Sequence, residues 1–212
     1  MTPLEQRNEQ LAQTIIKNLK RRHMEGFYCA TAEEAVRKVS ELIEDGSSVT
    51  WGGTMTVRDM GIPQYLKDRG TLEVLDRDLA ATPEEAQAIY LRAFSSDVYL
   101  SSANAVSEDG EIFNIDGTGN RLAGTLFGHE RVFIVAGTNK ICPDFDAALK
   151  RARNTAAVQN AERLDKKTPC RIDGTCHDCH GREGICRALT VLWGPMNGME
   201  TEIVLIDGDW GL

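Results

Sequence analysis

The stretch "RVFIVAG", residues 131–137, is a nearly continuous apolar run that ends at a glycine. Such a run is typical of a strand covered on both faces, as in the parallel sheets of α/β proteins. Shorter β-rich segments, "SVTW" (48–51) and "DVYLS" (97–101), precede it, and "EIVLI" (202–206) follows near the end of the sequence. We therefore predict a mainly parallel sheet in which residues 131–137 form a buried strand.

Segments with helical periodicity alternate with these extended runs. Apolar residues at helical spacing predict helices over about residues 3–23 and from 145 to about 164. Thr31 lies three residues before Glu34, the capping-box pattern that begins a helix, and Thr82 begins a second such pattern. Strands that alternate with helices of this length indicate an α/β fold with a doubly wound, mainly parallel sheet.

Composition and charge narrow the class of protein. The 212 residues include 42% hydrophobic and 26% charged side chains, so we expect one globular domain over residues 1–212. The formal net charge of −8 argues against a nucleic-acid partner. No run approaches the ~18 apolar residues of a membrane span, and "MTPLEQRNEQL" (1–11) lacks the apolar core of a signal peptide. We therefore predict a cytoplasmic protein without a membrane span and leave a homo-oligomer open.

Three loops follow predicted strands, and ligands of open parallel sheets bind beyond the carboxyl ends of strands. The first loop, residues 51–61, contains the pair Gly52 and Gly53, whose backbone N–H groups can approach a ligand closely. Thr54 or Thr56 can cap the next helix, whose N-terminus favours an anion. A tight strand-to-helix turn is an equally good explanation of the two glycines.

The second loop, residues 101–124, is the richest in polar groups and has a hairpin signal, Asp-Gly, at 109–110. Arg121 can bind a carboxylate or phosphate through two parallel N–H bonds. The alternative is a simple helix start, with Thr118 or Asn120 as its cap and Arg121 in a surface ion pair. The candidate ligand-binding residues of this loop are Asn104, Gly117, Thr118, Gly119, Asn120 and Arg121.

The third loop, residues 136–145, offers Asn139 and Lys140, although an exposed lysine at a strand end is often only solvated. Because all three loops bring anion-binding groups to one edge of one sheet, we predict a site there for a small anionic metabolite. No catalytic residue can be named, since the sequence has no Gly-x-Ser-x-Gly elbow, phosphate-binding loop or dinucleotide fingerprint. For His129 we expect a capping or surface role.

The segment "SSANAVSEDGEIFNIDGTGNRLAGTLFG" (101–128), followed by "RVFIVAGTNKICPDFDAALKRAR" (131–153), resembles the LUD domain, the lactate-utilisation family. The resemblance spans about residues 3–165, and the sequence after it resembles a short, single-domain branch with a C-terminal cysteine segment. It implies a fold like those of ribose-5-phosphate isomerase, glucosamine-6-phosphate deaminase, CoA transferases and formyltetrahydrofolate cyclo-ligase. It also implies a link to the oxidation of L-lactate to pyruvate, in which family members work with iron–sulphur partner proteins. A CoA-transferase-like or cyclo-ligase-like enzyme is an alternative.

The cysteines gather in an apparent insertion at about residues 168–187, where the periodicity is lost. Four thiolates spaced as Cys170-x5-Cys176-x2-Cys179-x6-Cys186 can bind zinc or an iron–sulphur cluster. A redox dithiol at Cys176 and Cys179 and unliganded surface cysteines are alternatives. A site closed by four thiolates is structural, so we expect a clamp for this segment and a ligand pocket elsewhere. The rival function is a module whose cysteine segment docks a redox partner or carries electrons.

Overall fold

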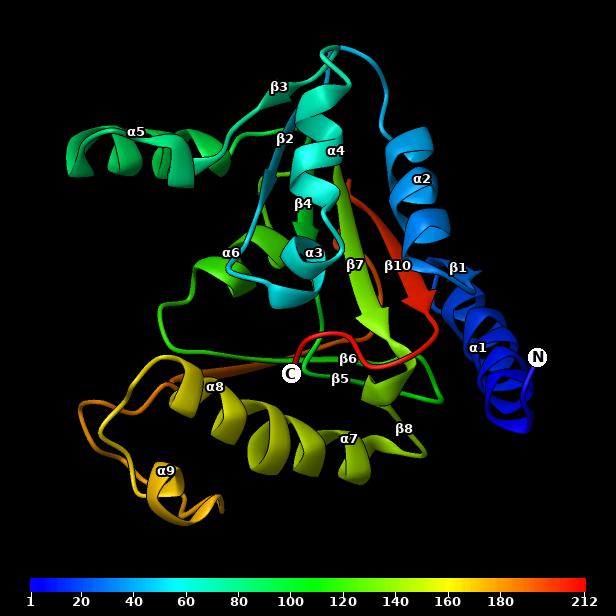
Figure 1. The fold of residues 1–212 in the computed structure, drawn as a ribbon, viewed down its shortest axis with the longest axis vertical. Helices are drawn as coiled ribbons and strands as arrows, with labels where there is room; N and C mark the ends of the chain where they lie inside the picture. The colour runs from blue at the N-terminus through cyan, green and yellow to red at the C-terminus, as the bar shows by residue number, and fades with distance from the viewer.

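The computed structural model describes residues 1–212 and contains two sheets (Figure 1). The larger sheet has six parallel strands in the order β1-β10-β7-β4-β2-β3. This arrangement confirms the predicted α/β fold with a mainly parallel sheet. The strands are β1 (Glu25–Cys29), β2 (Ser48–Trp51), β3 (Glu73–Val74), β4 (Val98–Ser101), β7 (Arg131–Gly137) and β10 (Glu200–Ile206).

Strand β7 lies between β4 and β10, which explains why almost all of its side chains are apolar. Phe133 and Val135 pack on one face of the sheet, whereas Val132 and Ile134 pack on the other. Both faces are covered by helices, so both sets of side chains are removed from water. The first face is covered by α2 (Ala32–Leu42), α3 (Met55–Asp59) and α4 (Ile62–Asp68), and the second by α1 (Pro3–Arg21).

Two helices begin at the capping threonines that the sequence predicts. Thr31 accepts a hydrogen bond from Glu34 N at 3.2 Å, as predicted, and Thr82 accepts one from Glu85 N at 3.2 Å. The Glu34 carboxylate reaches back to Ala30 N, one residue before the cap, so the reciprocal half of the capping box is displaced. The helix that begins after Thr82 is α5 (Pro83–Ala93), which extends away from the sheet at one edge of the molecule (Figure 1).

The smaller sheet has the order β8-β5-β6-β9 and lies beyond one end of the larger sheet (Figure 1). Its strands β5 and β6 form the predicted antiparallel hairpin, with Gly110 at φ 87° in the turn. The long helix predicted from residue 145 packs Ala148 and Ala152 against Phe113 of this sheet, and a π-helical turn interrupts it. The strands are β5 (Ala105–Ser107), β6 (Ile112–Asp116), β8 (Ile141–Cys142) and β9 (Ala188–Leu192), and the helix consists of α7 (Phe145–Arg151), the π turn Ala152–Ala156 and α8 (Ala157–Arg163).

Short elements complete the chain. The cysteine-containing insertion connects α8 to β9 and is largely irregular, which agrees with the lost periodicity. None of the helices combines the length and the apolar character that crossing a membrane requires. The remaining elements are α6 (Asn120–Leu126), α9 (Cys170–Asp173) and the 3-10 turns Arg77–Leu79 and Thr138–Lys140.

Candidate functional site

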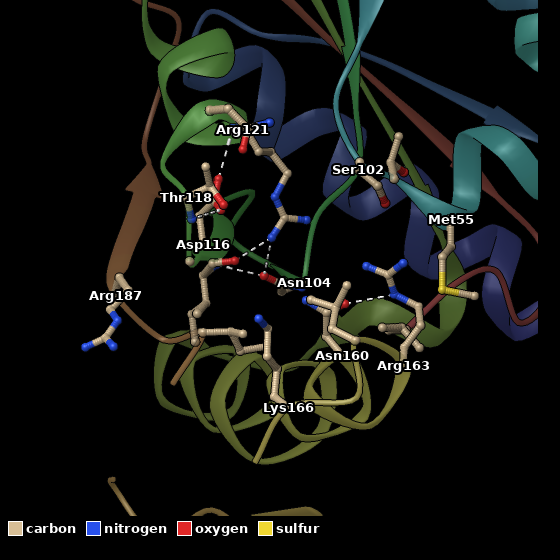
Figure 2. Close-up of a pocket in the computed structure, with 18 of the residues that line it drawn as sticks. Met55, Ser102, Asn104, Asp116, Thr118, Arg121, Asn160, Arg163, Lys166 and Arg187 are labelled. Carbon is tan, nitrogen blue, oxygen red and sulfur yellow. Dashed lines mark hydrogen bonds between the residues drawn. The ribbon is translucent and has the colours of Figure 1, made fainter. Parts of the chain in front are cut away.

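A cavity of about 710 Å³ lies where the carboxyl ends of β2, β4 and β7 face the smaller sheet and α8 (Figure 2). All three loops named in the sequence analysis contribute to its wall. The parallel order of the strands causes this convergence, because their carboxyl ends share one edge of the sheet. The predicted residues that line the cavity are Gly53, Thr54, Thr56, Asn104, Gly117, Thr118, Asn120, Arg121 and Lys140.

Three predicted residues do not line the cavity. Gly52 is buried beside it, and a Cβ atom there would lie 2.5 Å from the Tyr99 hydroxyl. Gly119 is the N-cap of α6, with φ 88°, a conformation that glycine adopts at little cost. Asn139 accepts a hydrogen bond from Trp210 N at 3.4 Å and so ties down the last residues of the sequence. Packing and backbone geometry therefore account for these three positions.

Arg121 extends from α6 toward the cavity and is held by the smaller sheet (Figure 2). Its guanidinium donates to Asn104 Oδ1 at 3.1 Å and to the carbonyl oxygen of Ile115. Arg121 has no carboxylate partner in a salt bridge, so the surface ion pair of the alternative interpretation is wrong. Burial lowers the pKa of Arg121, although Asp116 opposes this shift. A guanidinium fixed by neutral acceptors retains its positive charge for a ligand.

Asp116, rather than Thr118 or Asn120, satisfies the start of α6. Its carboxylate accepts hydrogen bonds from Thr118 N at 3.0 Å and from Arg121 N at 2.9 Å. The predicted caps are therefore wrong, and the N-terminus of α6 already faces a negative charge. As a consequence, Thr118 and Asn120 are left to line the cavity with their side chains.

The cavity wall is strongly basic, although the whole chain has a net charge of −8. Only Asp116 and Glu183 contribute acidic side chains to the lining. Cations in a concave site reinforce one another and attract anions. The cationic residues of the wall are Arg77, Arg121, Lys140, Arg163, Lys166, Arg182 and Arg187.

Two of these cations, Arg182 and Arg187, come from the cysteine-containing insertion. The insertion therefore forms part of the cavity wall, although none of its cysteines lines the cavity. Backbone hydrogen bonds explain its placement, because Arg187 N donates to Asp116 O at 3.1 Å and carries the chain into β9, beside β6. The irregular, polar pattern of this segment contains no indication of that pairing.

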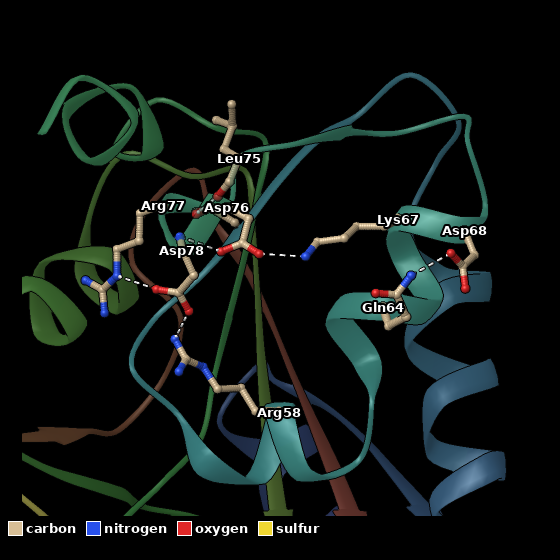
Figure 3. Close-up of polar contacts among 9 residues, drawn as sticks. Arg58, Gln64, Lys67, Asp68, Leu75, Asp76, Arg77 and Asp78 are labelled. Carbon is tan, nitrogen blue, oxygen red and sulfur yellow. Dashed lines mark hydrogen bonds and ion pairs between the residues drawn. The ribbon is translucent and has the colours of Figure 1, made fainter. Parts of the chain in front are cut away.

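Arg77 reaches the cavity from a 3-10 turn that a network of charges holds in place (Figure 3). The buried carboxylate of Asp76 accepts from Lys67 Nζ at 2.7 Å and from Asp78 N at 3.0 Å. Asp78 in turn accepts from Arg58 at 2.5 Å. The network joins α3 and α4 to the turn, so it fixes the backbone from which Arg77 extends.

Lys140 lies at the inner end of the cavity and is only 2% exposed. Its amine donates to Thr56 Oγ1 and to Ser102 Oγ, each at 3.0 Å, and no carboxylate lies within salt-bridge distance. Burial, followed by the charges of Arg151 and Arg121, lowers the pKa of Lys140 to about 7. At neutral pH a substantial fraction of this amine is therefore unprotonated. Lys140 is therefore a buried amine with a lowered pKa and not a solvated lysine.

The final residues of the sequence pack against this lysine. Thr56 Oγ1 donates to Trp210 O at 3.2 Å, and Arg151 donates to Leu212 O at 3.4 Å. Gly211 fits closely, since a Cβ atom there would lie 3.2 Å from Lys140 Nζ. These contacts exclude solvent from one side of the amine and leave the cavity as its open side.

His129 does not lie at the surface, so the surface role, one of the two expected roles, is wrong. It is buried, its ring stacks on Tyr99 at 5.0 Å, and its Nδ1 lies 2.8 Å from Ser96 O. Burial lowers the pKa of His129, so the ring is neutral at pH 7 and Nδ1 carries the proton that Ser96 O accepts. His129 does not line the basic cavity, and we assign it to the packing behind β4.

The four cysteines of the insertion line a second hollow of about 340 Å³, together with His177 and His180. Ile115, Gly184, Ile185 and Arg187 line both cavities, so the hollow lies directly behind the basic wall. The thiols are the ligands that zinc and iron–sulphur clusters prefer. In this structure, however, no three His, Cys, Asp or Glu side chains are close enough to bind one ion. The donor types fit a metal, but their arrangement here does not.

Comparison with known proteins identifies one matching family and several solved structures that align with the chain. Residues 12–206 match the model of the LUD domain family. A crystal structure of a DUF162 family protein from Deinococcus radiodurans aligns with a TM-score of 0.57 and 14% identity, covering 95% of this chain and 98% of that one. The Pyrococcus horikoshii translation initiation factor eIF-2B aligns with a TM-score of 0.37 and 15% identity, over 67% of each chain. No curated protein matches the chain.

Proposed function

The chain belongs to the LUD domain family, and we propose that its basic cavity binds a small organic anion with carboxylate or phosphate groups. In this proposal the protein serves the utilisation of lactate or a related organic acid. The observation that carries the proposal is the set of seven basic side chains, six of them besides the partly neutral Lys140, on one cavity wall in a chain of net charge −8. Repulsion among clustered cations is costly unless an anion offsets it, so the wall is better explained by a ligand than by folding.

Arg121 and Lys140 are the anion-binding groups at the inner end of the cavity. Arg121 is fixed by neutral oxygens and offers its remaining N–H groups to a carboxylate or phosphate. A Cβ atom at Gly53 would have no neighbour closer than 3.8 Å, so this glycine gives a ligand access to backbone N–H groups. The outer cations Arg163 and Lys166 surround the opposite side, where a second charged group of a longer ligand would bind (Figure 2).

The test is a thermal-shift and calorimetry panel of hydroxy acids, oxo acids, sugar phosphates, CoA esters and folates. We expect at least one anion to stabilise the wild type and Arg121→Ala to abolish that effect. Arg37→Ala is the matched control, because Arg37 is exposed on α2 and does not line the cavity. Equal stabilisation of wild type and Arg121→Ala would remove Arg121 from the binding site, and no stabilisation by any anion would end the proposal.

The same panel separates the enzymatic alternatives. A CoA-transferase-like function predicts that CoA esters give the largest shift, and a cyclo-ligase-like function predicts that folates do. The outer cations favour a phosphate-bearing ligand such as a CoA ester over a folate, because phosphates carry more charge at neutral pH. The Arg163→Ala and Lys166→Ala variants should then weaken the CoA ester more than a short hydroxy acid.

A second candidate function is a redox accessory protein that docks an iron–sulphur partner or carries electrons through the cysteine segment. The observation that favours it is the position of Cys170, Cys176, Cys179 and Cys186 around one hollow behind the cavity wall. Metal analysis of anaerobically purified protein tests it. Stoichiometric iron with visible absorbance supports this candidate, whereas colourless protein with one zinc supports a structural clamp.

A further inference from the structure

The amine at the inner end of the cavity is placed for covalent chemistry. We propose that Lys140 forms an imine with the carbonyl carbon of a 2-oxo acid, whose carboxylate binds Arg121. This proposal rests on the anion-binding function proposed above and names the class of ligand. The residues that carry it are Lys140, Arg121 and the two hydroxyls of Thr56 and Ser102.

The surroundings of Lys140 are those of a nucleophile rather than of a structural cation. Structural buried lysines pair with carboxylates, because an unpaired buried charge is costly. Lys140 is 2% exposed, and its hydrogen-bond partners are the neutral hydroxyls of Thr56 and Ser102. A substantial fraction of the amine is thereby in the neutral, nucleophilic form near pH 7.

The neighbouring cations specify where the ligand carboxylate binds. Arg121 donates to Asn104 Oδ1 and Lys140 donates to Ser102 Oγ, two residues earlier on the same cavity wall. We infer from this that one small molecule can reach both side chains. In a 2-oxo acid the carbonyl carbon is bonded directly to the carboxylate carbon. A carboxylate held by Arg121 therefore keeps the carbonyl near the amine, which raises its effective concentration.

The reaction balances without any further reactant. The Nζ lone pair attacks the carbonyl carbon, the carbonyl oxygen gains a proton, and a carbinolamine forms. The hydroxyl then leaves together with the remaining N–H proton as one water molecule, which gives the imine. Ser102 Oγ donates to Thr56 Oγ1 at 3.2 Å, and both hydroxyl oxygens accept from the amine. Ser102 also lines the cavity, so its hydroxyl can accept the proton that nitrogen loses and pass its own to the carbonyl oxygen.

Reductive trapping tests the proposal on the whole chain. Wild type is incubated with pyruvate and sodium cyanoborohydride, which adds hydride to the imine carbon and fixes a secondary amine on the protein. We expect one adduct per chain by intact mass, and peptide mapping should place it on Lys140. Lys140→Met should lose at least nine-tenths of the adduct, while Lys150→Met should retain it, because Lys150 is exposed on α7.

Controls distinguish this proposal from anion binding alone. L-Lactate has no carbonyl, so it should compete with pyruvate and leave no adduct. Calorimetry with pyruvate is run in parallel on wild type and Arg121→Ala. Arg121-dependent binding without an adduct would overturn the imine and preserve the proposed function. Neither binding nor adduct with pyruvate would also overturn the imine, and the proposed function would then be decided by the anion panel. An adduct spread evenly over surface lysines would also overturn the imine, and wild-type peptide mapping decides this even if Lys140→Met does not fold.

Discussion

Lys140 and Ser102 are 38 residues apart, yet Lys140 Nζ donates a hydrogen bond to Ser102 Oγ at 3.0 Å. Ser102 follows β4 directly, Lys140 ends the 3-10 turn after β7, and these strands are parallel neighbours. Thr56, which follows β2 on the other side of β4, completes the cluster. Topology alone therefore assembles an amine and two hydroxyls at one edge of the sheet.

The buried amine makes stability depend on pH. The pKa of Lys140 is about 7 in the folded chain and near its ordinary value of 10.5 in the unfolded chain. Between these values the unfolded state binds more protons, so the free energy of unfolding should rise as pH rises from about 7 toward 10. The difference is on the order of a few kcal/mol, at about 1.4 kcal/mol per pKa unit.

Urea denaturation of wild type and Lys140→Met at pH 7.0 to 9.5 measures this effect. Other groups titrate in both proteins, so the relevant quantity is the wild-type free energy minus that of the variant. We expect this difference to increase with pH, because only wild type has the amine. A difference that is constant across the range would show that Lys140 titrates normally.

Asn104 organises the inner wall, and its loss should affect both stability and binding. Its Oδ1 accepts from Ile115 N at 2.7 Å and from Arg121 at 3.1 Å. Asn104→Ala leaves the buried Ile115 N–H unpaired, which costs about 1–3 kcal/mol, and frees Arg121 to move. We expect a lower thermal midpoint and weaker anion binding, with the exposed Asn154→Ala as the control. Unchanged binding would exclude a positioning role for Asn104.

The strand at 131–137 and its neighbours could be predicted because their apolar character reflects burial on both faces. The three loops could be predicted to converge because parallel strands end at one edge. Strand β9 could not be predicted, because its apolar pattern is weak. It is the edge strand of the smaller sheet, and its residues Ala188 and Leu189 are exposed. Edge strands depend on pairing partners that local sequence does not identify.

The full set of residues in the cavity wall could not be predicted from the sequence for a similar reason. Arg182 and Arg187 reach the cavity only because β9 pairs with β6, a contact between distant segments. The burial of Lys140 depends on residues 209–212, which approach it from a different part of the sequence. Local periodicity reports which face of an element is apolar and does not report which remote segment covers a loop.

Alanine substitutions of the adjacent glycines Gly52 and Gly53 should affect different properties, the first stability and the second anion binding. At Gly52 a Cβ atom would lie 2.5 Å from the hydroxyl of Tyr99, whose buried ring is also contacted by Gly124. We expect Gly52→Ala to cost about 1–3 kcal/mol by overpacking. At Gly53 the nearest atom is 3.8 Å away, so Gly53→Ala should fold normally and only weaken anion binding. Equal effects of the two variants on stability and on affinity would contradict this division of roles.

Gly211 controls the solvent exposure of the amine, and its substitution tests the cause of the lowered pKa. It has φ 66°, and a Cβ atom there would lie 2.5 Å from Thr56 Oγ1 and 3.2 Å from Lys140 Nζ. Gly211→Ala should therefore displace residues 209–212 and admit water to the amine. Because burial is the largest cause of the shift, the pKa of Lys140 should rise toward 10.5. NMR titration of ¹³C-labelled lysine follows this midpoint, and Gly198→Ala, at another glycine of positive φ with open space around it, is the control. A midpoint that stays near 7 in Gly211→Ala would mean that Arg151 and Arg121, rather than exclusion of water by the final residues, hold the amine in its neutral form.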